Sequence, residues 1–390
     1  MILNPFFLLL LIYLIANTFA FFKLINLGGF NVFGYFWSVP IEISIISYML
    51  QILFLLIIYV FYKLNFTRNY KVFYVTPVWG YILLFITTSF FIFNQITGAG
   101  KAGAGFSFEG NNLLNIIFVL LQPDLLFLLL TPFIKSKRLF WILVIINFLS
   151  LISRGWMGSV LLILIVYLIR EYPVKMNFRN TILFILVFLL IFFSLPLLDA
   201  LKWGFRLNLT LDEIILNLLE VNYFETLYIV LESVISRFQN LYYVAYIFQN
   251  KQFYFESLLS GQMSWFYQNG IINSIYCKFA TCSMDINLYV ASNMVNDYTI
   301  TWNIDSGSSG WVSVLNIYSV YFFIFTFFLF LFSFRLYKKM YDSKGVILFG
   351  IFCLIYFFHG WLGAFYNVII YGFILSIFFR IKLRKKNETK

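Results

Sequence analysis

Residues 2–22, ILNPFFLLLLIYLIANTFAFF, decide the fold class because they form an apolar run of membrane-spanning length. A helix needs about 20 mainly apolar residues to cross the hydrocarbon core of a bilayer. No basic segment precedes the run, so we expect a retained first span rather than a cleaved signal peptide. The other long runs are 41–62, 72–94, 113–134, 181–198, 311–334 and 361–379, and shorter runs that suit tight helical hairpins are 139–152, 156–169 and 346–358. The pattern predicts an all-α polytopic membrane protein with about ten transmembrane helices.

The composition excludes several classes of protein. Apolar residue types make up 62% of the 390 residues and charged types only 11%, against about 45–50% and about 25% in soluble domains. A soluble globular protein and a disordered chain are therefore both excluded. The net charge of +11 does not indicate a nucleic-acid-binding protein, because so apolar a chain has no surface left for a basic stripe.

The distribution of Lys and Arg predicts the orientation in the membrane. The even-numbered connections and the C-terminal tail hold 19 of the 27 Lys and Arg residues, the short odd-numbered connections hold 3, and the long segment 199–310 holds 5. Basic residues in short loops favour the cytoplasmic side, whereas long loops cross regardless of charge. We expect both termini in the cytoplasm and 199–310 outside. The predicted organisation is transmembrane helices 1–7 in 1–198, a large periplasmic loop in 199–310, and transmembrane helices 8–10 with a basic cytoplasmic tail in 311–390.

The long segment 199–310 is predicted to be ordered and helical. Thr210 followed by Glu213 matches a capping box that opens a helix through Val221. From 223 to 250 apolar residues recur at helical spacing, with polar residues on the opposite face. Such amphipathic helices lie on a membrane surface or cap a helical bundle.

The cysteines and acidic residues give no metal-binding pattern. Cys277 and Cys282 lie five positions apart in the outward segment, where they form either a small-ring disulfide or two free thiols. Cys353 lies in an apolar run, and none of the three has zinc-site spacing. The outer connections contain no Asp-x-Asp pair. We therefore expect neither a metal nor a cofactor.

Arg154 is the sharpest candidate for a functional residue. It lies in Ser150–Trp156, the predicted tip of an outward-pointing hairpin. The preceding helix, 139–152, would be about 21 Å long at 1.5 Å per residue, whereas the hydrocarbon core is about 30 Å thick. Arg154 should therefore lie below the outer surface and need an anion. Its planar fork of donors suits a phosphate; the alternative is a side chain that snorkels to the lipid headgroups.

Two further ionisable residues lie in or beside predicted spans. Asp124 follows Pro123 within 113–134. It either pairs with a cation such as Arg154 or kinks the helix to open a cavity. The alternative to a functional role is a purely structural salt bridge. His359, the only histidine, lies at the outward tip of the hairpin 346–379. Histidine exchanges protons near neutral pH, which makes it the candidate general base. The alternative role for His359 is an interfacial hydrogen-bonding residue.

Three more basic residues belong to the outer segment. Arg237 is predicted to lie within the helix over 223–250, and Lys202 and Arg206 follow the run 181–198. With Arg154 they could form an electropositive pocket at the outer face. The alternative is solvated helix charge and headgroup contact.

The chain resembles the Wzy-type O-antigen polymerases. The resemblance rests on the number of spans, the long outward segment late in the chain, the hairpin tip Ser153-Arg154-Gly155 and the stretch Ser236-Arg237-Phe238. It implies a bacterial inner-membrane glycosyltransferase of lipopolysaccharide biosynthesis that works without a metal. The implied substrates are oligosaccharide repeat units linked to undecaprenyl pyrophosphate, joined at the periplasmic face, and a chain-length regulator is a further candidate partner. The resemblance implies catalytic roles for His359, Arg154 and Arg237 and substrate binding by Arg206, Lys202 and Asp124.

Other classes remain open at this point. The related O-antigen ligases share the loop layout and use an outer histidine with arginines, a role that His359 could match. A repeat-unit flippase would also need cations along a central path, although its charges are usually spread over many spans. A membrane acyltransferase usually carries its histidine early in the chain, and this chain has none there.

Overall fold

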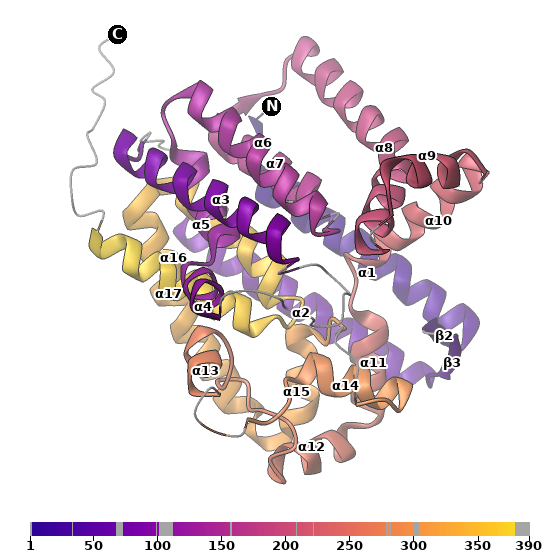
Figure 1. Cartoon of the computed structure of the whole chain (residues 1–390). Helices are drawn as coiled ribbons and strands as arrows, with labels where there is room; N and C mark the ends of the chain where they lie inside the picture. Colours follow the sequence, from indigo (N-terminus) through magenta and orange to yellow (C-terminus); the bar gives the residue numbers. More distant parts are fainter. Residues whose placement is uncertain are drawn as a thin grey trace. The chain divides into compact units, whose positions relative to one another are not determined.

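The protein is almost entirely helical, as Figure 1 shows. The computed structural model describes residues 2–32, 34–67, 73–98, 100, 112–156, 158–207, 209–220, 222–277, 280, 282–298 and 304–378, and it is 79% helical. Two small antiparallel ribbons, which the apolar runs did not predict, pair β1 (Ile2–Leu3) with β4 (Val174–Lys175) and β2 (Gly29–Val32) with β3 (Tyr35–Ser38). The prediction of an all-α fold is confirmed.

Six helices or helical runs in the described part of the chain are long and apolar enough to cross a membrane. They are α1 (Pro5–Leu27), α2 (Ile41–Asn65), α3 (Pro77–Thr97), the run Leu113–Phe133, α8 (Phe178–Leu207) and the run Gly307–Phe357. The chain is therefore a multi-pass membrane protein. Three other predicted spans are the shorter helices α6 (Lys137–Ser153), α7 (Ser159–Glu171) and α17 (Leu362–Phe378). The count of ten spans stays a prediction.

The predicted span 113–134 is broken rather than continuous. It consists of α4 (Asn112–Leu121), α5 (Pro123–Leu130) and the 3₁₀ turn η1 (Thr131–Phe133). Gln122, between the two α-helices, has a φ of 45°. The following residue is Pro123, which has no backbone N–H to continue the ladder of α4. Asp124 therefore lies in the first turn of a new helix, in agreement with the kink that its sequence suggested.

The expected connection at 335–345 contains a sharp reversal instead of a loop. α16 runs from Ser319 to Phe352 and is interrupted at Asp342, where φ is 54° and ψ is −137°. The chain doubles back there so sharply that a Cβ on Gly345 would lie 2.1 Å from the carbonyl oxygen of Tyr337. Glycine at 345 makes this turn possible without a loop. α15 (Gly307–Leu315) and the turn η2 (Asn316–Tyr318) precede α16, and the π-helical turn η3 (Cys353–Phe357) follows it.

α8 extends beyond the run that predicted it. The expected span ended at residue 198, but the helix continues to Leu207 despite Pro196 inside it. Lys202 and Arg206 therefore lie on its last turns instead of in a loop after it. Cations at this end interact favourably with the helix dipole.

The segment after α8 is ordered and helical, as predicted. The helices are α9 (Leu211–Glu220), α10 (Tyr223–Ser236), α11 (Leu241–Gln249), α12 (Lys251–Leu259), α13 (Ile271–Tyr276) and α14 (Ile286–Val295). The capping box is present, because the backbone N–H of Thr210 donates to Glu213 and the N–H of Glu213 donates back to the Thr210 hydroxyl. Cys277 and Cys282 form a disulfide, with Cα atoms 5.5 Å apart.

The prediction of a single helix over 223–250 is wrong at the centre of that range. α10 ends at Ser236 and α11 starts at Leu241, so Arg237 lies in the break and not within a helix. Long-range hydrogen bonds explain the break. The side-chain amide of Asn17 donates to the carbonyl of Phe238, and that of Asn240 donates to the carbonyl of Phe358. Helical periodicity cannot reveal such partners.

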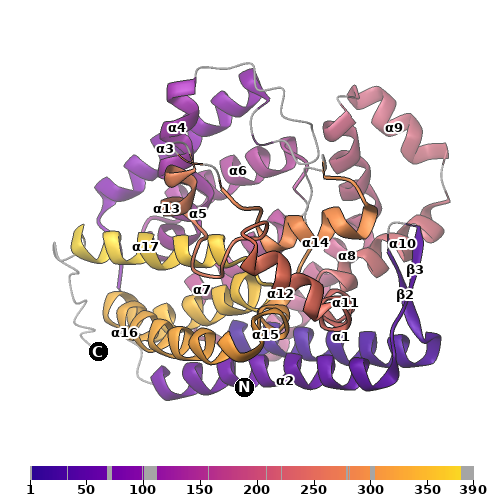
Figure 2. The same cartoon turned by 90° about the horizontal axis from the view of Figure 1, so that it is seen from below.

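The chain divides into two compact units. The first comprises Met1–Pro5, Val72–Val234 and Arg380–Lys390, and the second comprises Phe6–Lys71 and Ile235–Phe379. In the first, α3 packs on α5 and α6, and α8 packs on α9. In the second, α2 packs along α16, and α11 packs on α2 and α15 (Figure 2). Its core is rich in aromatic rings, with Phe330 in contact with both Phe357 and Phe365.

Candidate functional site

Arg154, in the first unit, forms an ion pair with Asp124, in which the arginine is buried and the carboxylate is partly exposed. The Nη2 atom of Arg154 donates to Oδ1 and Oδ2 of Asp124 at 2.9 and 2.8 Å, and Nε donates to the carbonyl of Ser150 at 3.0 Å. The guanidinium also lies over the ring of Phe90, 5.0 Å from its centroid. Arg154 is only 6% exposed. Its anionic partner is therefore Asp124, as one of the sequence alternatives proposed.

Arg206 and Lys202 lie beside the same hairpin tip. Arg206 donates from Nε and Nη2 to the carbonyl of Gly155 at 3.2 and 3.0 Å. Lys202 pairs with Asp199 at 3.1 Å, and both basic side chains lie over the ring of Trp203. Beside them a cavity of about 210 Å³ lies between α8, α9 and α10. The structure thus brings Arg154, Arg206 and Lys202 together, but each already has an acceptor within the unit.

Gly155 permits this close approach. Its φ is +75°, and a Cβ added to it would lie 2.7 Å from Cγ of Arg206. Any other residue would suffer both backbone strain and this clash. Glycine at position 155 therefore allows the Ser153-Arg154-Gly155 tip to pack closely against α8.

His359, in the second unit, lies between a hydroxyl and a carboxylate. Its Nε2 is 2.7 Å from Oη of Tyr13, and its Nδ1 is 3.4 Å from Oδ2 of Asp305. All three residues are buried. The Nδ1 contact does not have hydrogen-bond geometry, so Asp305 acts on the ring by charge. A carboxylate beside Nδ1 favours the tautomer with the proton on Nδ1, which leaves Nε2 to accept from the Tyr13 hydroxyl.

The turn that carries His359 is fixed by hydrogen bonds from three distant segments. The backbone N–H of Gly307 donates to the carbonyl of His359 at 3.1 Å, and the side-chain amide of Asn240 donates to that of Phe358 at 2.8 Å. The side-chain amide of Asn287 donates to the carbonyl of Gly360 at 3.3 Å. The imidazole is therefore held in place by the fold itself.

Arg237 lies in the same unit, and the residue that follows it contacts this group. Phe238, the next residue, packs its ring edge-on against Tyr13 at 5.5 Å. Arg237 also acts on the hydroxyl of Tyr243. Burial raises the pKa of Tyr243 to about 12, the negative charge of Asp305 adds to this shift, and the positive charge of Arg237 opposes it. The Arg237 side chain is exposed and makes no hydrogen bond or ion pair with any residue that the structure describes.

The predicted site residues therefore fall into two groups. Arg154, Asp124, Arg206 and Lys202 belong to the first unit, and His359 and Arg237 belong to the second. Sequence reasoning missed Tyr13 and Asp305. A hydroxyl within an apolar span was the available signal for Tyr13. For Asp305 the signal was its place before the polar run Ser306-Gly307-Ser308-Ser309-Gly310, which is unusual in so apolar a chain.

No family model, no curated protein and no solved structure matches this chain. Within the residues that the structure describes, no group of three or more His, Cys, Asp or Glu side chains could hold a metal ion. The chemistry must be argued from the two groups themselves. Only the second combines a base with a carboxylate, a hydroxyl and an uncommitted cation.

Proposed function

We propose that the chain is a glycosyltransferase that joins lipid-linked oligosaccharide repeat units at the outer face of a bacterial inner membrane, as its resemblance to the Wzy-type polymerases implies. The observation that carries the proposal is His359, held between Tyr13 and Asp305, with the exposed Arg237 next in sequence to Phe238, whose ring packs on Tyr13. Glycosyl transfer to a sugar hydroxyl needs a base for the acceptor and a positive charge for a pyrophosphate leaving group.

In the proposed reaction the acceptor hydroxyl gives its proton to Oη of Tyr13 while the Tyr13 proton moves to Nε2 of His359. The acceptor oxygen forms a bond to the anomeric carbon of the donor, and the bond from that carbon to the lipid pyrophosphate breaks. Asp305 stabilises the imidazolium that forms, in the way that a carboxylate supports a catalytic histidine. Arg237 stabilises the negative charge on the departing pyrophosphate.

The ion pair of Arg154 with Asp124 receives a different role in this proposal. The sequence suggested pyrophosphate binding by Arg154, but three of its hydrogen bonds go to Asp124 and Ser150. We assign to it the positioning of the hairpin tip against α8. Arg237, whose guanidinium lacks such partners, is the better candidate for the leaving group.

The test is the ladder of surface polysaccharide in a deletion strain that expresses each variant at equal membrane levels. His359→Asn should lower polymer formation by about 10²–10⁴-fold, and Arg237→Ala by about 10²–10³-fold. Lys251→Ala is the matched control, because Lys251 is an exposed cation on the adjacent outer helix α12. Full-length ladders from both His359→Asn and Arg237→Ala would reject the proposal.

The same gel separates the other candidates. A polymerase defect leaves single repeat units attached to the lipid core, because export and ligation continue. An O-antigen ligase defect, the alternative that His359 also supports, removes single units and polymer alike. A flippase moves its cargo without a base, so a wild-type ladder from His359→Asn with export intact would favour that class.

A further inference from the structure

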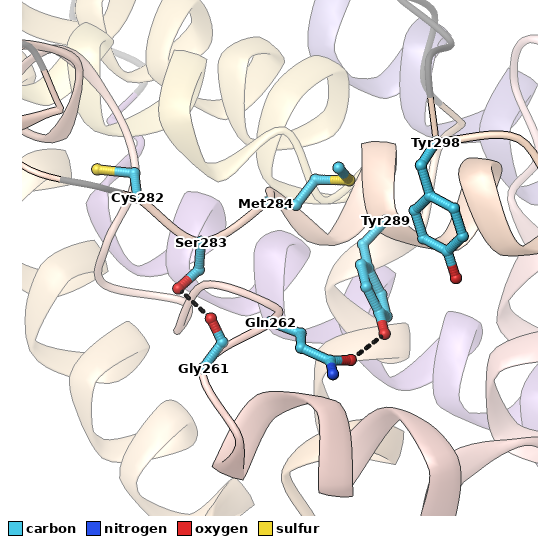
Figure 3. Close-up of a pocket in the computed structure, with 7 residues that line it drawn as sticks. All are labelled: Gly261, Gln262, Cys282, Ser283, Met284, Tyr289 and Tyr298. Atoms are coloured by element: carbon cyan, nitrogen blue, oxygen red, sulfur yellow. Dashed lines mark hydrogen bonds between the residues drawn. The ribbon is translucent and has the colours of Figure 1, made fainter.

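A large open pocket lies in the second unit, away from His359, in the segment between α12 and residue 298. Its volume is about 690 Å³, and Figure 3 shows the residues that line it. They come from the turn after α12 at Gly261 and Gln262, from the chain that leads into α14, and from Tyr298 beyond that helix. The mechanism proposed above makes no use of this pocket.

The chemistry of the pocket is polar but uncharged. None of its described lining residues carries a charged side chain. The Gln262 amide accepts from Tyr289 through Oε1, and its Nε2 makes no hydrogen bond within the described chain, so it can donate to a ligand. The ring of Tyr298 is 54% exposed, and its hydroxyl is already tied to Asn293 at 2.7 Å. An exposed aromatic face beside amide and hydroxyl groups matches the apolar face and the hydroxyls of a neutral sugar.

One disulfide and several hydrogen bonds join the walls of the pocket. Cys282, which lines it, is bonded to Cys277. The N–H of Met284 donates to the carbonyl of Gln262 at 3.1 Å. The hydroxyl of Tyr289 donates to the Gln262 side chain at 2.8 Å, a bond that Figure 3 shows. When a site is preformed, little binding free energy is lost in ordering its side chains. This favours weak, repeated contacts with a sugar chain.

α14 connects the pocket to the His359 group. Tyr289 on this helix lines the pocket, and Asn287, two positions earlier, donates to the carbonyl of Gly360 and accepts from the N–H of Ser306. The whole helix of 10 residues is about 15 Å long. A saccharide in the pocket would therefore lie within a few sugar units of the His359 group.

We propose that this pocket binds neutral sugar residues of the polysaccharide at a distance from the reacting bond. The proposal rests on the proposed function and deepens it. A chain held there stays bound between successive transfers, so the pocket sets how many units are added before release. Loss of the pocket contact should shorten the product without removing the first linkage.

The first experiment measures binding by saturation-transfer NMR, with the full-length protein in detergent. The probe is the polysaccharide released by mild acid from the cells that make it, and maltotriose serves as the foreign saccharide. Tyr298→Ala should weaken binding of the probe about three- to tenfold, which is the typical effect of losing one aromatic contact. Tyr267→Ala is the matched control, because Tyr267 is 55% exposed in the same segment but does not line the pocket.

The second experiment compares ladders. Tyr298→Ala should keep the first linkages and shift the most abundant chain length downward, whereas Tyr267→Ala should give the wild-type ladder. Unchanged probe binding by Tyr298→Ala, an equal loss with Tyr267→Ala, or no binding of the probe by the wild-type protein would each overturn the proposal. His359→Asn separates the two proposals, because it should bind the probe normally; a full ladder from it would refute the reaction and leave the binding result standing.

Discussion

The hydroxyl of Tyr13 lies 2.7 Å from Nε2 of His359, although 346 positions separate the two residues in the chain. The ring of Tyr13 also packs edge-on against Phe238 and Phe358, with centroids 5.5 and 5.3 Å away. Packing and the hydrogen bond can therefore be separated by one substitution, since phenylalanine keeps the ring and removes only the hydroxyl.

Tyr13→Phe should lower polymer formation by about 10²-fold or more, because the proton path to His359 is lost. The free energy of unfolding should fall by about 1–3 kcal/mol, the usual cost of a buried group left without its partner. The measurements are the polysaccharide ladder and thermal unfolding in detergent. Tyr48→Phe, which removes a hydroxyl bonded to Thr18 at 2.9 Å, should leave the ladder unchanged, and an unchanged ladder from Tyr13→Phe would remove this residue from the reaction.

Substitution of Gly155 should weaken the packing of the hairpin tip on α8 and lower the free energy of unfolding. In Gly155→Ala the new Cβ meets Arg206 at 2.7 Å and the backbone must keep a φ of +75°, so we expect a destabilisation of about 1–3 kcal/mol. Gly158→Ala is the control, because a Cβ there meets nothing within 4 Å. Melting temperatures in detergent measure both, and equal values for the two variants would contradict the proposed packing.

Arg154 and Asp124 should be coupled energetically. Arg154→Ala, Asp124→Ala and the double variant should give a coupling free energy of about 1–3 kcal/mol in a double-mutant cycle of thermal unfolding. Arg154→Lys should not restore the wild-type value, because one ammonium cannot reproduce the contacts with both Asp124 and the Ser150 carbonyl. Additive single effects would show that the pair contributes nothing.

Asp285 should make stability depend on pH. Burial raises the pKa of Asp285 from 3.8 to about 6, although hydrogen bonds from Asn287 oppose the shift. Between these pH values the folded state keeps a proton that the unfolded state has lost, so the free energy of unfolding should fall as the pH rises from about 4 to about 6. Asp285→Asn should flatten this slope and keep the N-cap of α14. Asp212→Asn, at an exposed position on α9, should retain the slope, and a wild-type slope from Asp285→Asn would exclude this carboxyl as its source.

The side of the membrane on which the reaction occurs is also testable. Reporter fusions after residues 66, 136, 175 and 340 should report cytoplasm, because the neighbouring connections carry most of the Lys and Arg. Fusions within 210–300 should report periplasm. A cytoplasmic signal from 210–300 would place the Arg237 and His359 group on the wrong side for a periplasmic transferase.

Hydropathy predicted the helical class and the approximate positions of most helices, because burial in lipid imposes long apolar runs. It also placed a connection at 335–345, which contains the break at Asp342, and Pro123 indicated the break at Gln122. It did not predict the break at Arg237, which depends on hydrogen bonds from distant parts of the chain, those of Asn17 and Asn240.

The candidate site was predictable only in part. His359 and Arg154 were predicted as candidates because ionisable residues are rare in the apolar runs and costly at membrane depth. The sequence offered the pair of Arg154 with Asp124 as one alternative, but it could not show that this pair belongs to one unit and that His359 and Arg237 belong to the other. Tyr13 escaped notice because tyrosine is common in membrane helices, and only the three-dimensional structure shows its contact with His359.

The hydrogen bonds that fix His359 and its turn also bear on when the proposed site can form during synthesis of the chain. Tyr13, Asn240, Asn287 and Gly307 all leave the ribosome before His359 does. The polar groups of these residues have no partner in the turn 358–360 until the final hairpin has been inserted. If the proposed reaction is correct, a nascent chain should be inactive until residue 359 has been made, and a stop codon before that position should abolish the reaction although most of the membrane helices have been made.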